Sequence, residues 1–109
     1  MATRRNVLFV CTANQQRSPT AEELYRNDRR FNVRSAGTST LSRQPVSREL
    51  LEWADLVVVM EERHAHAIGE RFPGEAAKAR MVVLGIPDVF QYMDSTLQRE
   101  IRERFEAEL

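Results

Sequence analysis

Short apolar segments and longer amphipathic segments alternate along the chain. Three runs are apolar without interruption, namely residues 7–10, 56–60 and 81–84. Runs of this kind are typical of strands that are buried on both faces of a parallel sheet. Residues 31–34 (Phe-Asn-Val-Arg) alternate instead, which predicts a half-exposed edge strand. The hydrophobic pattern therefore predicts four strands.

Apolar residues recur at helical spacing between and after these strands. Helices are predicted from about residue 18, over residues 47–54 and 61–72, and from residue 95 onward. Pro19 suits the first turn of the first helix, and Ser95 followed by Gln98 has the pattern of a capping box with Ser95 as N-cap. Strands that alternate with helices predict a doubly wound α/β fold, with a four-stranded, mostly parallel sheet and helices on both faces.

Length and composition narrow the class of protein. The chain of 109 residues is predicted to be one domain, residues 1–109, and its sixteen basic and sixteen acidic residues cancel. We therefore expect neither nucleic acid nor a membrane surface as partner, and no apolar run approaches the roughly 18 residues that span a bilayer. The single cysteine and the lack of an export signal predict a cytoplasmic location.

The only cysteine directly follows the first apolar run. Arg17 stands six residues after Cys11, and Ser18-Pro19 marks the start of a helix. In open α/β sheets ligands bind beyond the carboxyl ends of the strands, where Cys11 is expected. The N–H groups of the loop and of the first helical turn lack intrahelical partners and, with the helix dipole, favour an anion. Arg17 adds a planar fork that can bind two phosphate oxygens.

The same electrostatic field favours the thiolate of Cys11 and makes it a nucleophile. We therefore expect attack of the sulfur on phosphorus, giving a cysteinyl-phosphate that water hydrolyses. Ser18 is a candidate hydroxyl donor to the sulfur, and its alternative role is that of N-cap. The alternative for Cys11 is an inert, buried cysteine at the end of a strand.

The first motif resembles the signature of the low-molecular-weight protein-tyrosine phosphatases. It reads VLFVCTANQQRSPTAE in residues 7–22, with an apolar strand, Cys-x5-Arg-Ser-Pro and a helix, and it includes Asn14. Three later segments resemble the family in the same order, VRSAGTS (33–39), ADLVVVMEERH (54–64) and IPDVFQYMD (86–94). The resemblance touches nearly the whole chain and implies a short member of the family.

The resemblance implies a role for each matching residue. Cys11 is the nucleophile, Arg17 holds the phosphoryl group, and Asp88 is the general acid that later serves as base. Asn14 braces the loop, against Ser35 or the segment that follows it. The phosphate cradle is lined by the amides of Thr12, Ala13, Asn14, Gln15, Gln16, Arg17 and Ser18.

Alternatives remain for the late loop. Asp94 is the rival acid, with capping of the last helix as its other role. Phe90 and Tyr92 either flank a substrate ring or belong to the core and its rim.

Some positions depart from the family pattern. The segment 40–53 is shorter than the corresponding family segment, Val89 stands where the family prefers proline, and Gln16 replaces a second cysteine of some members. A shorter wall predicts a more open cleft and leaves selectivity for phosphotyrosine proteins open.

The sequence predicts a phosphomonoester hydrolase that acts on protein-tyrosine or aryl phosphates, with no metal or cofactor. One alternative is a non-enzymatic phosphate- or phosphopeptide-binding module, and another is an arsenate reductase, which would need an external thiol because no second cysteine is present. A third is a cysteine-based oxidant sensor. His64 and His66 are predicted to be surface histidines rather than metal ligands, because residues two apart on a helix point to nearly opposite sides.

Overall fold

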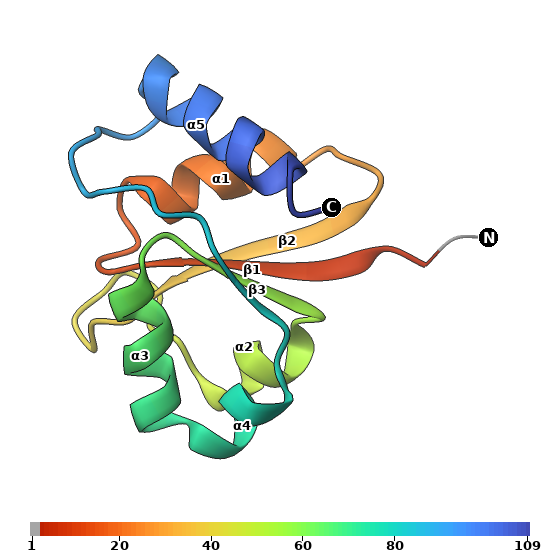
Figure 1. Cartoon of the computed structure of the whole chain (residues 1–109), viewed down its shortest axis with the longest axis vertical. Coiled ribbons are helices and arrows are strands. Elements are labelled where there is room, and N and C mark those ends of the chain that lie inside the picture. The colour runs from red at the N-terminus through yellow and green to blue at the C-terminus, as the bar shows by residue number, and fades with distance from the viewer. Residues whose placement is uncertain (1–2) are drawn as a thin grey trace.

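A parallel sheet between two layers of helices makes up the computed structural model, which describes residues 3–109 (Figure 1). The elements are β1 (Arg5–Cys11), α1 (Arg17–Tyr25), β2 (Phe31–Gly37), α2 (Arg48–Trp53), β3 (Leu56–Val59), α3 (Glu62–Arg71), α4 (Pro73–Lys78), β4 (Met81–Val83) and α5 (Ser95–Glu106). The strand order is β2-β1-β3-β4, and every pair is parallel. The predicted fold class is confirmed. Because the strands are parallel, the loops that follow them meet at one edge of the sheet.

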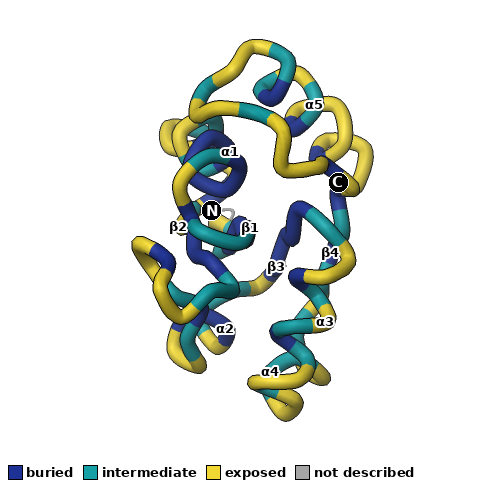
Figure 2. The backbone as a smooth tube through the Cα atoms, turned by 90° about the vertical axis from the view of Figure 1, so that its left-hand side faces the viewer, coloured by how far each residue is buried: buried dark blue, intermediate teal, exposed yellow. Residues whose placement is uncertain are grey.

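The two faces of the sheet carry separate cores. Val7 and Phe9 of β1 pack under α1 and α5, whereas Leu8 and Val10 pack toward α2 and α3. These four side chains are fully buried, which explains the uninterrupted apolar run in the sequence. Figure 2 shows the buried strands between the two helix layers.

β2 is the edge strand that the alternating pattern predicted. Phe31 is buried, whereas Asn32 and Arg34 are exposed. The strand continues beyond the predicted residues to Gly37, which pairs with Cys11 of β1. A Cβ atom at Gly37 would lie 2.4 Å from the carbonyl oxygen of Thr12, so only glycine allows this close approach. This contact brings the segment after β2 against the loop after β1.

The predicted helices are present, with one difference at a helix end and one helix more than predicted. The N-cap of α5 is Asp94, whose Oδ1 accepts from the N–H groups of Thr96 at 2.8 Å and Leu97 at 3.1 Å. The prediction of Ser95 as cap is therefore wrong, because a carboxylate one residue earlier satisfies the free N–H groups. The short helix α4, which begins at Pro73, was not predicted. None of the helices in residues 3–109 combines the length and the apolar character needed to cross a bilayer.

Candidate active site

The loop between β1 and α1 curls at Asn14. We call residues 11–17 the Cys-x5-Arg loop. Asn14 has φ 56°, a left-handed conformation that asparagine tolerates better than most residues. Within residues 3–109, no backbone carbonyl accepts a hydrogen bond from the N–H groups of residues 12–18. A run of free N–H groups in such a turn, at the N-terminus of a helix, favours an anion.

The carbonyl groups of the loop are bonded on its other side. The carbonyl oxygens of Cys11, Thr12 and Ala13 accept from the N–H groups of Thr38, Ser39 and Arg43, at 2.9, 3.0 and 3.3 Å. We call residues 38–45 the rim segment. Because successive carbonyls face the rim segment, the loop presents its N–H groups elsewhere, and they remain available to a ligand.

The Cys11 sulfur is hydrogen-bonded at the base of the loop. Its Sγ lies 3.0 Å from Ser18 Oγ. Asn14 Nδ2 donates to Ser18 Oγ and to Ser35 Oγ, each at 2.9 Å, so the predicted contact between Asn14 and Ser35 is present. Ser18 Oγ accepts from Asn14 and has one proton to donate, for which the Cys11 sulfur at 3.0 Å and the Ala36 carbonyl oxygen at 3.3 Å compete. When the proton points at the sulfur, the nearer of the two, it stabilises a thiolate. The alternative of Ser18 as N-cap is wrong, since Gln16 holds that position.

Arg17 points into the protein, with 1% of its side chain exposed. Its NH1 donates to Glu61 Oε1 at 2.5 Å and to the carbonyl oxygen of Ile86 at 2.8 Å. Its Nε lies 3.7 Å from Asp88 Oδ1. Two partners therefore fix NH1. The edge formed by Nε and NH2, whose Nε faces Asp88, is the part of the guanidinium with the geometry to bind two oxygens of an anion.

Asp88 and Asp94 have different surroundings. Asp88 follows β4 in a segment that hydrogen bonds hold to β3, from Leu84 N–H to the Val59 carbonyl and from Ile86 N–H to the Met60 carbonyl. Its side chain is 55% exposed and faces Arg17. Asp94 is engaged as the cap of α5. Of the two acids considered from the sequence, Asp88 is the one beside the loop.

We call residues 84–94, between β4 and α5, the Asp88 loop. Three large apolar or aromatic side chains are exposed in the two segments, Leu41 in the rim segment and Val89 and Tyr92 in the Asp88 loop. Phe90 packs against the core beneath α1 and α5, which is the core role considered for it. Tyr92, half-exposed, stays available to a substrate ring.

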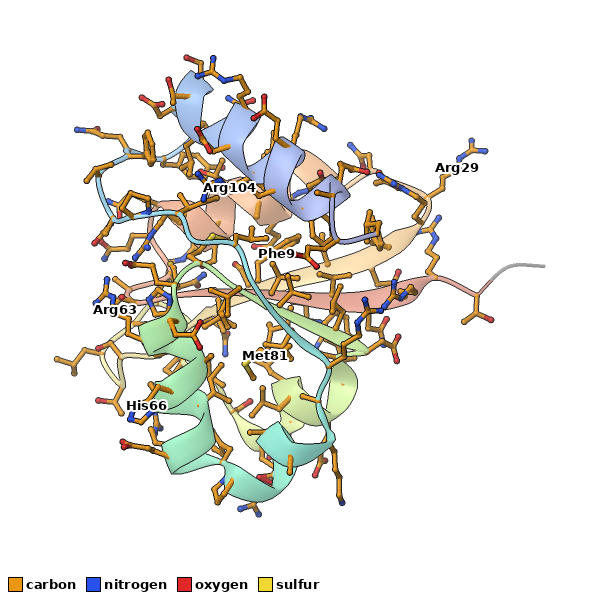
Figure 3. All side chains as sticks on the ribbon, in the orientation of Figure 1. Phe9, Arg29, Arg63, His66, Met81 and Arg104 are labelled. Carbon is orange, nitrogen blue, oxygen red and sulfur yellow. The ribbon has the colours of Figure 1, made fainter. Side chains whose placement is uncertain are left out.

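His64 is buried, so its prediction as a surface residue is wrong. Its Nδ1 accepts from the Glu61 N–H at 3.0 Å, and its Nε2 lies 2.8 Å from Thr12 Oγ1. Burial lowers its pKa to about 4, with a further contribution from the charges of Arg17 and Arg63. His66 is exposed and pairs with Glu70, and Figure 3 places it on the outer side of α3.

Glu61 is a second residue whose role the sequence reading missed. Burial alone would raise the pKa of its carboxyl, but hydrogen bonds from Arg17 and Arg63 outweigh that effect and hold the pKa below its usual value. The carboxylate is therefore ionised at neutral pH and available to brace Arg17. The sequence signal was its place as the first residue of a predicted helix (61–72), directly after the apolar run 56–60.

The lowered pKa of His64 predicts a loss of stability in weak acid. The pKa rises from about 4 in the folded protein to its ordinary value of about 6.5 on unfolding, so the unfolded chain binds the proton more readily between these values. The free energy of unfolding is expected to fall by about 2 kcal/mol from pH 7 to pH 5. Urea denaturation at both pH values measures this change.

The matched variants are His64→Gln and His66→Asn. We expect His64→Gln to reduce the fall and His66→Asn to leave it in place. Equal pH dependence in wild type and His64→Gln would contradict the assignment. The charged groups that act on the titration of His64 are Arg17, Arg63, Glu61 and Asp88.

Comparisons with known proteins find similar proteins among phosphatases. The family model for low molecular weight phosphotyrosine protein phosphatase matches residues 6–48. A protein-arginine-phosphatase of Bacillus subtilis (strain 168) is 32% identical over 94 residues, covering 62% of this chain and 63% of that protein. The match thus spans less than two thirds of the length of the curated relative.

Solved structures share the fold over most of the chain. A YwlE mutant from Bacillus subtilis is 28% identical with a TM-score of 0.67, covering 94% of this chain and 92% of that chain. The YwlE arginine phosphatase from Geobacillus stearothermophilus is 25% identical with a TM-score of 0.66, covering 95% and 94%. The tyrosine phosphatase Wzb from Escherichia coli K30, in complex with phosphate, is 21% identical with a TM-score of 0.77, covering 96% of each chain.

The fold and the loop define an α/β protein with a candidate anion site, the Cys-x5-Arg loop, at the carboxyl edge of its sheet. Residues 6–48 match the low molecular weight phosphotyrosine protein phosphatase family model, and the fold is similar to that of the solved YwlE structures.

Proposed function

We propose that the protein is a cysteine-dependent phosphomonoester hydrolase. One observation carries the proposal: two reactive groups lie at the N-terminus of α1. The Cys11 sulfur is hydrogen-bonded to Ser18, and the Arg17 guanidinium faces inward and is held by Glu61. The free N–H groups of residues 12–18 supply further donors beside them. A nucleophile next to an anion site is the arrangement that phosphoryl transfer to a protein side chain requires.

In the first step the Cys11 thiolate attacks the phosphorus of the substrate. The sulfur–phosphorus bond forms while the bond from phosphorus to the leaving oxygen breaks. Arg17 and the loop N–H groups bind the phosphoryl oxygens, whose charge must be stabilised in the transition state. Protonated Asp88 donates its proton to the leaving oxygen, which departs as an alcohol or phenol.

In the second step water attacks the phosphorus of the cysteinyl-phosphate. The Asp88 carboxylate takes one proton from the water, and the sulfur–phosphorus bond breaks. The products are inorganic phosphate, the Cys11 thiolate and a protonated Asp88, ready for the next substrate. In both steps, the substrate, water and these side chains supply and accept every proton that moves.

We infer that phosphotyrosine or another aryl phosphate is the substrate. Leu41, Val89 and Tyr92 are exposed apolar or aromatic side chains near the rim segment and the Asp88 loop, and an aromatic leaving group can contact such side chains. The single cysteine functions as a thiol, which is consistent with a cytoplasmic location. Phosphoarginine is the second candidate, because the relative at 32% identity is a protein-arginine-phosphatase.

Three substrates test the proposal. The wild-type protein is expected to release phosphate from p-nitrophenyl phosphate and from a phosphotyrosyl peptide. We expect kcat/KM to be at least about tenfold higher for the phosphotyrosyl peptide than for the same peptide with phosphoarginine. Release of phosphate in an initial-rate assay measures both. The reverse ranking would make phosphoarginine the substrate, and phosphate binding without release from any of the three would favour a non-enzymatic binding module.

A further inference from the structure

Both ends of the Cys-x5-Arg loop are tied to the N-terminus of α3. At the first end, Thr12 Oγ1 lies 2.8 Å from His64 Nε2. At the other end, Arg17 NH1 donates to Glu61 Oε1 at 2.5 Å. Glu61 and His64 are themselves joined, since the Glu61 N–H donates to His64 Nδ1 at 3.0 Å. The residues thus form a chain of contacts, Thr12–His64–Glu61–Arg17, that spans the loop.

The direction of each hydrogen bond in this chain is fixed by chemistry. Because His64 Nδ1 accepts the Glu61 N–H, the proton of the neutral ring lies on Nε2. Nε2 therefore donates, and Thr12 Oγ1 accepts. Only 1% of His64 is exposed, so water competes little for the ring. A neutral histidine with one defined tautomer is the form that makes both contacts at once.

The loop needs such support before an anion binds. The positive ends of its N–H groups and the Arg17 charge gather around one point, so they repel one another when no anion is present. Asn14 also holds a left-handed conformation that costs backbone energy. Contacts that fix the two ends of the loop oppose its relaxation into a shape that no longer fits a phosphoryl group.

We propose that His64 is a positioning residue of the phosphate site and acts through the hydroxyl of Thr12, while Glu61 holds the other end of the loop through Arg17. The inference deepens the proposed function, but its first consequence concerns the binding of phosphate and is independent of turnover. It also gives a role to the histidine pair of the sequence: His64 faces the loop, and His66 faces outward.

Thr12→Val is the sharpest test, because valine keeps the shape of threonine and removes the oxygen that accepts from His64. The dissociation constant of inorganic phosphate, measured by isothermal titration calorimetry, is expected to rise about tenfold. His64→Leu is expected to produce a similar rise. In the double variant the two effects are expected not to multiply, because both substitutions remove the same contact.

Two further variants separate positioning from general packing. His64→Gln retains a donor and an acceptor and is expected to restore much of the phosphate affinity lost in His64→Leu. His66→Asn is expected to bind phosphate as the wild type does. If His64→Leu fails to fold, Thr12→Val and His64→Gln still decide the question.

The outcomes distinguish this inference from the proposed function. If Thr12→Val binds phosphate as tightly as the wild type, or if the two losses multiply in the double variant, the positioning role is wrong. That result leaves turnover by the wild type untouched. If the wild type binds phosphate and responds to Thr12→Val but hydrolyses no phosphomonoester, the proposed function fails and the positioning role stands.

Discussion

Replacing Cys11 with serine is expected to abolish hydrolysis of p-nitrophenyl phosphate while the binding of inorganic phosphate survives. The rate is expected to fall by about 10⁴-fold or more, because a serine hydroxyl in this place is a far weaker nucleophile than a thiolate. The groups that hold the anion remain, since Arg17 keeps its bonds to Glu61 and Ile86. Initial rates and calorimetric titration with phosphate measure the two effects separately.

Retention of phosphate binding is the internal control for this variant. Turnover by Cys11→Ser at the wild-type rate would rule out a covalent intermediate on sulfur. Loss of phosphate binding together with turnover would mean that the Cys11 sulfur shapes the loop, and the assignment as nucleophile would then lose its main support. Ser18→Ala is the matched variant, because it removes the hydroxyl that lies 3.0 Å from the sulfur and leaves the sulfur in place. Its rate is expected to lie between those of wild type and Cys11→Ser.

Features with a local or periodic signal could be predicted from the sequence. The β1 strand has an uninterrupted apolar run because it lies at the centre of a sheet that is covered on both faces. Cys11 and Arg17 lie within one strand–loop–helix unit, so their spacing, together with the helix-start signal Ser18-Pro19, indicated a common site. Asp88 was indicated by the resemblance of residues 86–94 to the family's late loop, and its place after the last predicted strand supported this.

Features that depend on distant partners were missed. His64 contacts Thr12, 52 positions away in the sequence, and Glu61 contacts Arg17, 44 positions away. No local sequence pattern indicates either contact. The helix geometry that argued against a metal site at His64 and His66 also indicates that one of the two histidines is buried. If two histidines on a helix point to opposite sides, one of them faces the protein, and Ile68, four residues after His64, lies on that buried face.

The end of a helix is also a weak signal in the sequence. Asp94 and Ser95 are both good N-caps, and only the backbone shows that Ser95 is already helical. The choice mattered because capping by Asp94 removes the rival acid from the candidate site. Whether the N-cap of α5 is Asp94 or Ser95 thus decides which carboxylate remains a candidate general acid.

Replacing Asp88 with asparagine is expected to slow the hydrolysis of aryl phosphates by about 10²- to 10⁴-fold, the usual contribution of a general acid. The loss is expected in kcat, because the amide cannot donate a proton to the leaving oxygen. Affinity for inorganic phosphate is expected to be kept or to rise, because asparagine cannot carry the negative charge that Asp88, 3.7 Å from Arg17, has once it has given up its proton. Steady-state kinetics and phosphate titration measure this opposite response of rate and affinity.

Leaving groups and a matched control make the test specific. A substrate with a more acidic phenol needs less protonation as it departs, so the loss in Asp88→Asn is expected to shrink from phenyl phosphate to 2,4-dinitrophenyl phosphate. Asp94→Asn is the control, because asparagine is also a good N-cap and α5 should remain capped. A larger loss in Asp94→Asn than in Asp88→Asn, or a loss in Asp88→Asn that is the same for every leaving group, would show that Asp88 is not the proton donor.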